Sequence, residues 1–314
     1  MPSRSPTTSF SPGDVALVAI VSVAWGAAYI FIRQGILLGA SPLLFAAARY
    51  GLTAGVFFVI ALAVRARLPP RRAGLLSIAI GGPLMFALYG GLLYWGEQFT
   101  TGGYAAVLAS TFPLLTVALG YSLLPQEKLT VGGLAGILLG FGGVAVLVLP
   151  EALSQSVGTW QGIAFVLGAM GSGALGTVLL RKYGGGKQGL WQIGGQFAFG
   201  AGLLGGAVLA LPIPEVLPGT ASVWTSLGLL VGVSSVLGYF AYFTLHHRAG
   251  PVRANVVAYL VPVVGVVLGT GLYGEPFTLW EPLGLGIVLV GVSLVIWAPG
   301  RPGQAPPPTP SSDP

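Results

Sequence analysis

Ten apolar stretches, each about as long as the roughly 20 residues a helix needs to cross a bilayer, are separated by short polar loops. Charged residues make up only 7% of the 314-residue chain, whereas a water-soluble domain has roughly 25%. The sequence therefore predicts an all-α integral membrane protein with ten transmembrane helices. The expected spans are Val15–Ile36, Pro42–Val64, Ala73–Gly96, Gly103–Leu124, Thr130–Leu149, Gly158–Leu180, Leu190–Leu211, Val223–Leu245, Pro251–Leu272 and Leu279–Trp297.

Two parts of the chain resemble each other. Tyr104–Leu149 aligns with Val252–Trp297, with a one-residue slip. Pro113 meets Pro262, and after the slip Glu127 meets Glu275. Each half has five expected helices, and an odd number of spans makes the second copy enter the membrane upside down. We expect a first repeat over residues 14–150 and a second, inverted repeat over 158–298. Tails rich in Pro, Ser and Thr, residues 1–13 and 299–314, are expected to be disordered.

The charges divide by side of the membrane. Every Lys and Arg except Arg33 and Arg49 falls on the side of the N-terminus, while Glu97, Glu215 and Glu275 fall on the other. The positive-inside rule then predicts a cell-membrane protein with both termini in the cytoplasm. Because the basic residues are scattered over loops, they predict no nucleic-acid partner.

Polar and aromatic side chains at membrane depth tend to face the interior of a helix bundle. Helical spacing gives a set expected to line a substrate cavity between the two halves. The aromatic members would stack on or hydrogen-bond the solute, and the amide of Asn255 would orient it. Any single Tyr or Ser could instead make an ordinary interhelical hydrogen bond. The set is Trp25, Tyr29, Arg49, Tyr94, Gln98, Ser110, Tyr239, Tyr242, Asn255 and Tyr259.

Four of the polar and proline positions have two interpretations each. Arg49 could pair with an anionic group of the substrate, or it could reach outward or bond carbonyl groups of neighbouring helices. Pro113 and Pro262, expected inside the fourth and ninth helices, could be hinges or rigid packing kinks. Glu97 could bind a cation or act as a gate, but solvation in an outer loop is the expected state.

Several absences narrow the function. The chain has no Cys, which excludes disulfides and thiol catalysis. His246 and His247 are the only histidines and cannot share a helix face, so no metal is expected. No phosphate-binding loop of an ATP motor is present, and no cofactor is expected. Nucleophile, base and metal groups do not converge anywhere, so an enzyme is not predicted. No Asp, Glu or Lys lies at mid-membrane, which argues against strong proton coupling.

Small residues repeat at helical spacing in two spans. Gly132, Gly136 and Gly140 form one stripe, and Ala198, Gly202 and Gly206 form another. We expect both to be internal helix contacts rather than a dimer seam. The chain is accordingly expected to be a monomer in the lipid bilayer.

The sequence resembles the EamA-type permeases of the drug/metabolite transporter superfamily over nearly its whole length. The resemblance rests on Trp25-Gly26, on the segment from Tyr94 to Gln98, and on the two related segments from Ala105 to Glu127 and from Ala254 to Glu275. It implies a ten-helix carrier with a central cavity, many members exporting amino acids or other small metabolites. Small multidrug relatives couple to protons through an intramembrane Glu that this chain lacks.

Together these features predict a secondary transporter, an exporter or exchanger of a small metabolite such as an amino acid. Alternating access of a central cavity would be its mechanism. A multidrug or other-solute permease is the alternative within transporters. A non-transporting channel or scaffold is the alternative outside them.

Overall fold

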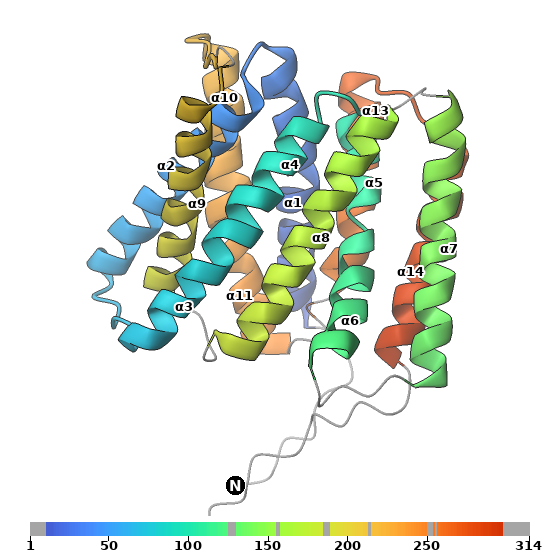
Figure 1. Ribbon diagram of the computed structural model, residues 1–314, viewed down its shortest axis with the longest axis horizontal. Helices are drawn as coiled ribbons and strands as arrows, with labels where there is room; N and C mark the ends of the chain where they lie inside the picture. The colour runs from blue at the N-terminus through green and yellow to red at the C-terminus, as the bar shows by residue number, and fades with distance from the viewer. Residues whose placement is uncertain are drawn as a thin grey trace, which may run out of the picture.

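The computed structural model describes residues 11–124, 130–154, 158–184, 189–212, 215–249, 254 and 256–297. Within these ranges the chain is a bundle of helices lying side by side (Figure 1). The helices are α1 (Pro12–Leu37), α2 (Pro42–Ala63), α3 (Arg71–Gly81), η1 (Gly82–Leu88), α4 (Tyr89–Gly96), α5 (Gly102–Leu108), α6 (Thr111–Leu123), α7 (Val131–Ser154), α8 (Trp160–Tyr183), α9 (Leu190–Ala210), α10 (Ala221–Leu229), η2 (Leu230–Leu237), α11 (Gly238–Ala249), α13 (Val257–Tyr273) and α14 (Trp280–Trp297).

The predicted all-α membrane fold is confirmed. Eight apolar helices are long enough to span a bilayer, and two shorter apolar helices match the ninth and tenth expected spans. Three of the spans are not single regular helices. The third runs through α3, η1 and α4, the fourth through α5 and α6, and the eighth through α10, η2 and α11.

The third and eighth spans share an unusual feature, a stretch of π-helix in the middle. Stretches of this kind are rare and often lie at functional sites. The first begins at Gly82 and the second at Leu230, 148 positions later, which is also the offset between Tyr94 and Tyr242. Pro83 stands in the first stretch and Val231 in the second, so a shared proline does not explain the shared geometry.

The fourth span breaks where Pro113 has no N–H to offer the carbonyl group of Ala109. The backbone N–H of Ser110 bonds Val107, and that of Phe112 bonds Ala109, in tighter turns than an α-helix has. Pro113 is therefore the third residue of α6 and not a residue inside one continuous helix, as the sequence suggested. Pro262 does lie inside its helix, α13.

Glycines bring helix backbones together. A Cβ added at Gly26 of α1 would lie 2.8 Å from the carbonyl oxygen of Val261 in α13. A Cβ at Gly291 of α14 would lie 2.6 Å from the backbone nitrogen of Gly140 in α7. The helices α7 and α14 form a pair at one side of the bundle (Figure 1). One expected stripe is thus an internal contact, whereas Gly202 and Gly206 of the other face open space.

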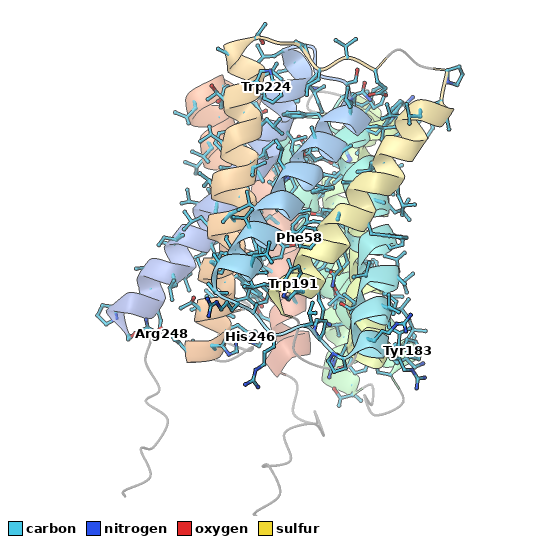
Figure 2. All side chains as sticks on the ribbon, turned by 90° about the vertical axis from the view of Figure 1, so that its left-hand side faces the viewer. Phe58, Tyr183, Trp191, Trp224, His246 and Arg248 are labelled. Atoms are coloured by element: carbon cyan, nitrogen blue, oxygen red, sulfur yellow. The ribbon has the colours of Figure 1, made fainter. Side chains whose placement is uncertain are left out.

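The bundle has two ends, which we name after an acidic residue at each. The Asp14 end is where α1 begins and α11 finishes. The Glu97 end is where α4 finishes, α5 begins and α13 finishes. Figure 2 shows Tyr183, His246 and Arg248 at the Asp14 end and Trp224 at the opposite end.

The contact between α7 and α14 gives the first testable prediction. Gly291→Ala puts a methyl group against the backbone of Gly140 and is expected to cost about 1–3 kcal/mol, as overpacking typically does. Gly286→Ala in the same helix meets no atom within 4 Å and should be neutral or slightly stabilising. Thermal unfolding in detergent measures both, and equal melting temperatures for the two variants would contradict the close approach.

Candidate functional site

Arg49 of α2 is the cation inside the bundle around which polar groups gather. Its Nε donates to the hydroxyl oxygen of Ser235 in η2 at 3.2 Å, and its Nη1 donates to the hydroxyl of Tyr94 in α4 at 3.2 Å. The guanidinium carbon lies 5.6 Å from the ring centre of Tyr50, within the range of cation–π attraction. We call Arg49, Tyr50, Tyr94 and Ser235 the Arg49 cluster. Arg49 therefore points into the bundle and not outward to the membrane surface.

An aromatic wall continues from this cluster. It consists of Trp25 of α1, Phe197 of α9, and Tyr239 and Tyr242 of α11. The ring centre of Trp25 is 5.0 Å from that of Tyr242 and 6.0 Å from that of Tyr239, and Phe197 lies 5.6 Å from Tyr239. Phe197 also lies 5.6 Å from Tyr50, so the wall and the Arg49 cluster are in direct contact.

Two glycines at equivalent positions of the halves make room for these rings. A Cβ at Gly90 would lie 2.4 Å from the Tyr50 ring, and a Cβ at Gly238, 148 positions later, would lie 2.7 Å from Nε1 of Trp25. Each glycine thus seats one large aromatic ring of another helix. The glycines at positions 90 and 238 therefore have the same packing role in the two halves of the chain.

The structure brings together six of the predicted cavity residues. Arg49 and Tyr94 are bonded to each other, and Trp25, Tyr239 and Tyr242 form the wall. Tyr29 is buried in the same core, with its hydroxyl near that of Tyr89.

Three others lie elsewhere. The side chain of Gln98 is at the Glu97 end and donates to the carbonyl of Trp95 at 3.3 Å. Tyr259 packs toward α14, where its hydroxyl oxygen accepts a bond from Ser293 at 3.3 Å. Ser110 is buried at the break between α5 and α6, and Asn255 lies outside the described residues.

The chemistry of the Arg49 cluster is that of an anion site. A guanidinium has five N–H donors, and two of those of Arg49 donate hydrogen bonds to hydroxyl groups of the protein. No carboxylate among the described residues pairs with Arg49, and the same part of the chain contains no group of three metal-ligating side chains. A planar cation of this kind binds a carboxylate with two parallel hydrogen bonds. The aromatic wall beside it is suited to an apolar or aromatic group.

The Glu97 end is closed by contacts between the two halves of the chain. The carboxylate of Glu275, after α13, accepts the backbone N–H of Gly102 at 3.0 Å and that of Gly103 at 2.7 Å. This caps the first turn of α5, where a negative charge is favoured. The guanidinium of Arg33 in α1 donates to the carbonyl oxygens of Glu97 and Gln98. We call the Glu275 bonds to Gly102 and Gly103 the Glu275 latch.

The surroundings of the Glu97 side chain differ from those expected from the sequence. Its side chain is fully buried, and neither carboxylate oxygen has a hydrogen-bond partner among the described residues. Burial, with the nearby charge of Glu275, raises the pKa of its carboxyl group well above the usual range. Outer-loop solvation was the expected state, and it is wrong because α4 ends below the loop surface, against α1 and α8.

The Asp14 end is closed by different chemistry. Arg248 at the end of α11 forms an ion pair with Asp14 of α1, with Nε 3.2 Å from Oδ1. Its Nη2 also lies 3.5 Å from the hydroxyl of Ser11. Side chains therefore join α1 to a neighbouring part of the chain at both ends of the bundle.

Comparison with known proteins identifies the family. The model of the EamA-like transporter family matches residues 14–149 and, a second time, residues 160–297. The chain belongs to the EamA-like transporter family. It is accordingly a multi-pass membrane transporter and not an enzyme, and the resemblance noted from its motifs is confirmed.

Relatives cover nearly the whole chain. The inner membrane transporter YedA of Escherichia coli K12 is 31% identical over 303 residues, covering 90% of this chain and 92% of the relative. Protein PecM of Dickeya dadantii is 29% identical and covers 87% and 88%. A solved crystal structure with 18% sequence identity superposes with a TM-score of 0.60 over 90% of this chain and 96% of the other, which supports the fold.

Sequence reasoning missed Tyr50, Tyr89 and Phe197. Tyr50 directly follows Arg49, and a ring next to a membrane-embedded cation was a usable signal. Phe197 gave no such signal, because a phenylalanine in an apolar span is most often ordinary core. Its role comes from the crossing of α9 with α2 and η1, which only the tertiary structure shows.

The bond between Arg49 and Tyr94 gives a second prediction. Tyr94→Phe removes the hydroxyl that accepts from Arg49 and should lower the free energy of unfolding by about 1.5–3 kcal/mol, typical of a hydrogen bond to a charged group. Tyr50→Phe is the matched control, since Tyr50 contacts Arg49 only through its ring in the described structure. Thermal unfolding at neutral pH compares them, and an equal effect of both changes would argue against the hydrogen bond.

Proposed function

We propose that this transporter moves a small metabolite bearing a carboxylate, with amino acids as the leading class, by export or exchange. The observation that carries the proposal is the unpaired charge of Arg49 in the bundle interior. Hydroxyl groups of the protein accept from only two of the five N–H groups of its guanidinium, and aromatic rings lie beside it. A carboxylate would pair with Arg49, and the aromatic wall would pack against the rest of the solute.

Alternating access between two inverted repeats is the proposed mechanism. One family model matches each half separately, and the π-helical stretches start 148 positions apart. Contacts at both ends of the bundle support a carrier over a channel, because a standing pore has no reason to be bridged at both ends. With the positive-inside rule, the Asp14 end would be cytoplasmic and the Glu97 end outside.

Transport by reconstituted protein tests the substrate class. A labelled amino acid should be taken up by proteoliposomes, and its unlabelled form should compete, whereas the matching amide and decarboxylated amine should not. Arg49→Gln should weaken competition by the carboxylate about 100-fold, because a lost buried charge pair typically costs about 2–5 kcal/mol. Arg49→Lys should have an intermediate effect, since it keeps the charge and loses the planar fork.

The control is Arg72→Gln, which removes an exposed cation at the start of α3 and should leave uptake unchanged. Equal competition by the amine and the carboxylate would overturn the role of Arg49 and favour a permease of broader specificity. If no small solute moves, a non-transporting role replaces the proposal.

The two prolines are proposed hinges that flank the interior site. Pro113 follows the break between α5 and α6, and Pro262 leaves the carbonyl of Ala258 without its helical partner. Pro113→Ala and Pro262→Ala should restore helical hydrogen bonds and stiffen these points. We expect turnover to fall at least severalfold while the apparent affinity for solute changes little. Unchanged turnover in both variants would mean that the prolines are only packing kinks.

A further inference from the structure

Glu97 is a buried acid that the proposed substrate site does not use. It follows the last residue of α4 and is fully enclosed, and both of its carboxylate oxygens lack a hydrogen-bond partner in the described part of the chain. An isolated ionised carboxylate in such a place is very costly, and buried acids normally become neutral instead.

The other half of the chain shows that this position does not need an acid. Leu245 is the residue 148 positions after Glu97, and it is also fully buried, in α11. The same place in the fold is thus filled by a hydrocarbon side chain of similar size. Packing alone therefore gives no reason for a carboxyl group at position 97.

Charged groups surround Glu97 from several elements without contacting its carboxyl oxygens. The guanidinium of Arg33 donates to the backbone carbonyl of Glu97 and not to its carboxylate. On the side of α8, Phe165 and Val166 pack against Gly96, the preceding residue, and Tyr104 of α5 instead bonds the carbonyl of Leu147. The titratable and charged groups near enough to act on the carboxyl are Arg33 and Tyr29 of α1, Arg49 of α2, Tyr94 of α4, and Glu275.

We propose that Glu97 is a proton-binding site, and that its proton holds the Glu275 latch closed. With the proton bound, Glu97 is neutral and Glu275 keeps its charge on the first turn of α5. When the proton leaves for water at this end, two carboxylates carry charge near each other, which disfavours the closed form. Arg33 can then pair with the carboxylate of Glu97 in place of the carbonyl oxygens.

The direction of the pH effect follows. The buried carboxyl of the closed form has a raised pKa compared with the same group in water at the open end. The closed form therefore binds more protons than the open form. It is favoured below the ordinary pKa of Glu, about 4.3, and loses its advantage as the pH rises toward the raised pKa. This deepens the proposed alternating access, on which it rests, by making a proton one of the bound species.

Infrared spectroscopy tests the proton directly. At neutral pH the purified wild-type protein should show the C=O stretch of a protonated carboxyl group, and Glu97→Gln should lose that band. Glu97→Leu, the residue that stands at position 245, gives a second variant if the glutamine folds poorly. Glu215→Gln is the control, since Glu215 lies at the same end and already accepts a bond from the backbone N–H of Leu44. A band that survives in both Glu97 variants overturns the proton site.

Cysteine labelling tests the latch. The chain has no Cys, so Ile30→Cys introduces a single thiol. Ile30 is 1% exposed, and its Cδ1 would lie 3.0 Å from a Cβ placed on Gly102, directly beneath the latch. A membrane-impermeant maleimide should label it slowly while the latch is closed. Comparison of this variant with and without Glu97→Gln at each pH removes the effect of thiol ionisation.

With Glu97 present, labelling relative to the Glu97→Gln background should increase with pH, by at most about tenfold per pH unit for one proton. In the Glu97→Gln background the latch should stay closed at every pH. A ratio that does not change with pH overturns the link between the proton and the latch. Neither measurement uses a transported solute, so failure of the proton site is distinguishable from failure of the proposed substrate class.

Discussion

Helices in a bilayer have no hydrophobic reason to leave lipid for one another, so this bundle depends on how closely their backbones approach. Gly26 lets α1 lie against α13, and Gly143 and Gly291 let α7 lie against α14. At each of these points one methyl group would force the helices apart. The same device acts at the centre, where Gly90 and Gly238 admit the rings of Tyr50 and Trp25. The absence of a side chain at these glycines therefore determines both how closely the helices pack and where the rings of the candidate site lie.

This constraint also decides where polar atoms can be placed. Inside a bilayer a charged group needs partners, and Arg49 finds them in the hydroxyls of Ser235 and Tyr94 and in the Tyr50 ring. These partners satisfy part of its hydrogen-bonding capacity and none of its charge. Because all of its partners are neutral, Arg49 is our candidate for the group that binds an anionic solute. Glu97 is the opposite case, an acid with no partner, and it is stable in the closed form as a neutral group.

The sequence predicted the architecture well because lipid imposes a simple rule: about 20 apolar residues for each span. It also singled out Trp25, Tyr94 and Arg49, which the structure brings together, since polar and aromatic side chains at membrane depth are few. Prediction from the sequence failed for side chains whose surroundings are determined by contacts between helices. The spacing of Tyr259 placed it on the predicted cavity face. In the structure its hydroxyl is instead hydrogen-bonded to Ser293 of α14. Glu97 follows an apolar span, and only the positions of α1 and α8 show that its side chain is buried.

The helix α1 links the interior site to both ends of the bundle. Its 26 residues run from Asp14, paired with Arg248, past Trp25 in the aromatic wall, to Arg33 on the carbonyls that follow α4. Between the two ends, α1 crosses α13 at Gly26, where the backbones lie close together. The two closures are built from different chemistry, an ion pair at one end and a proton-dependent cap at the other, and α1 is the element that they share.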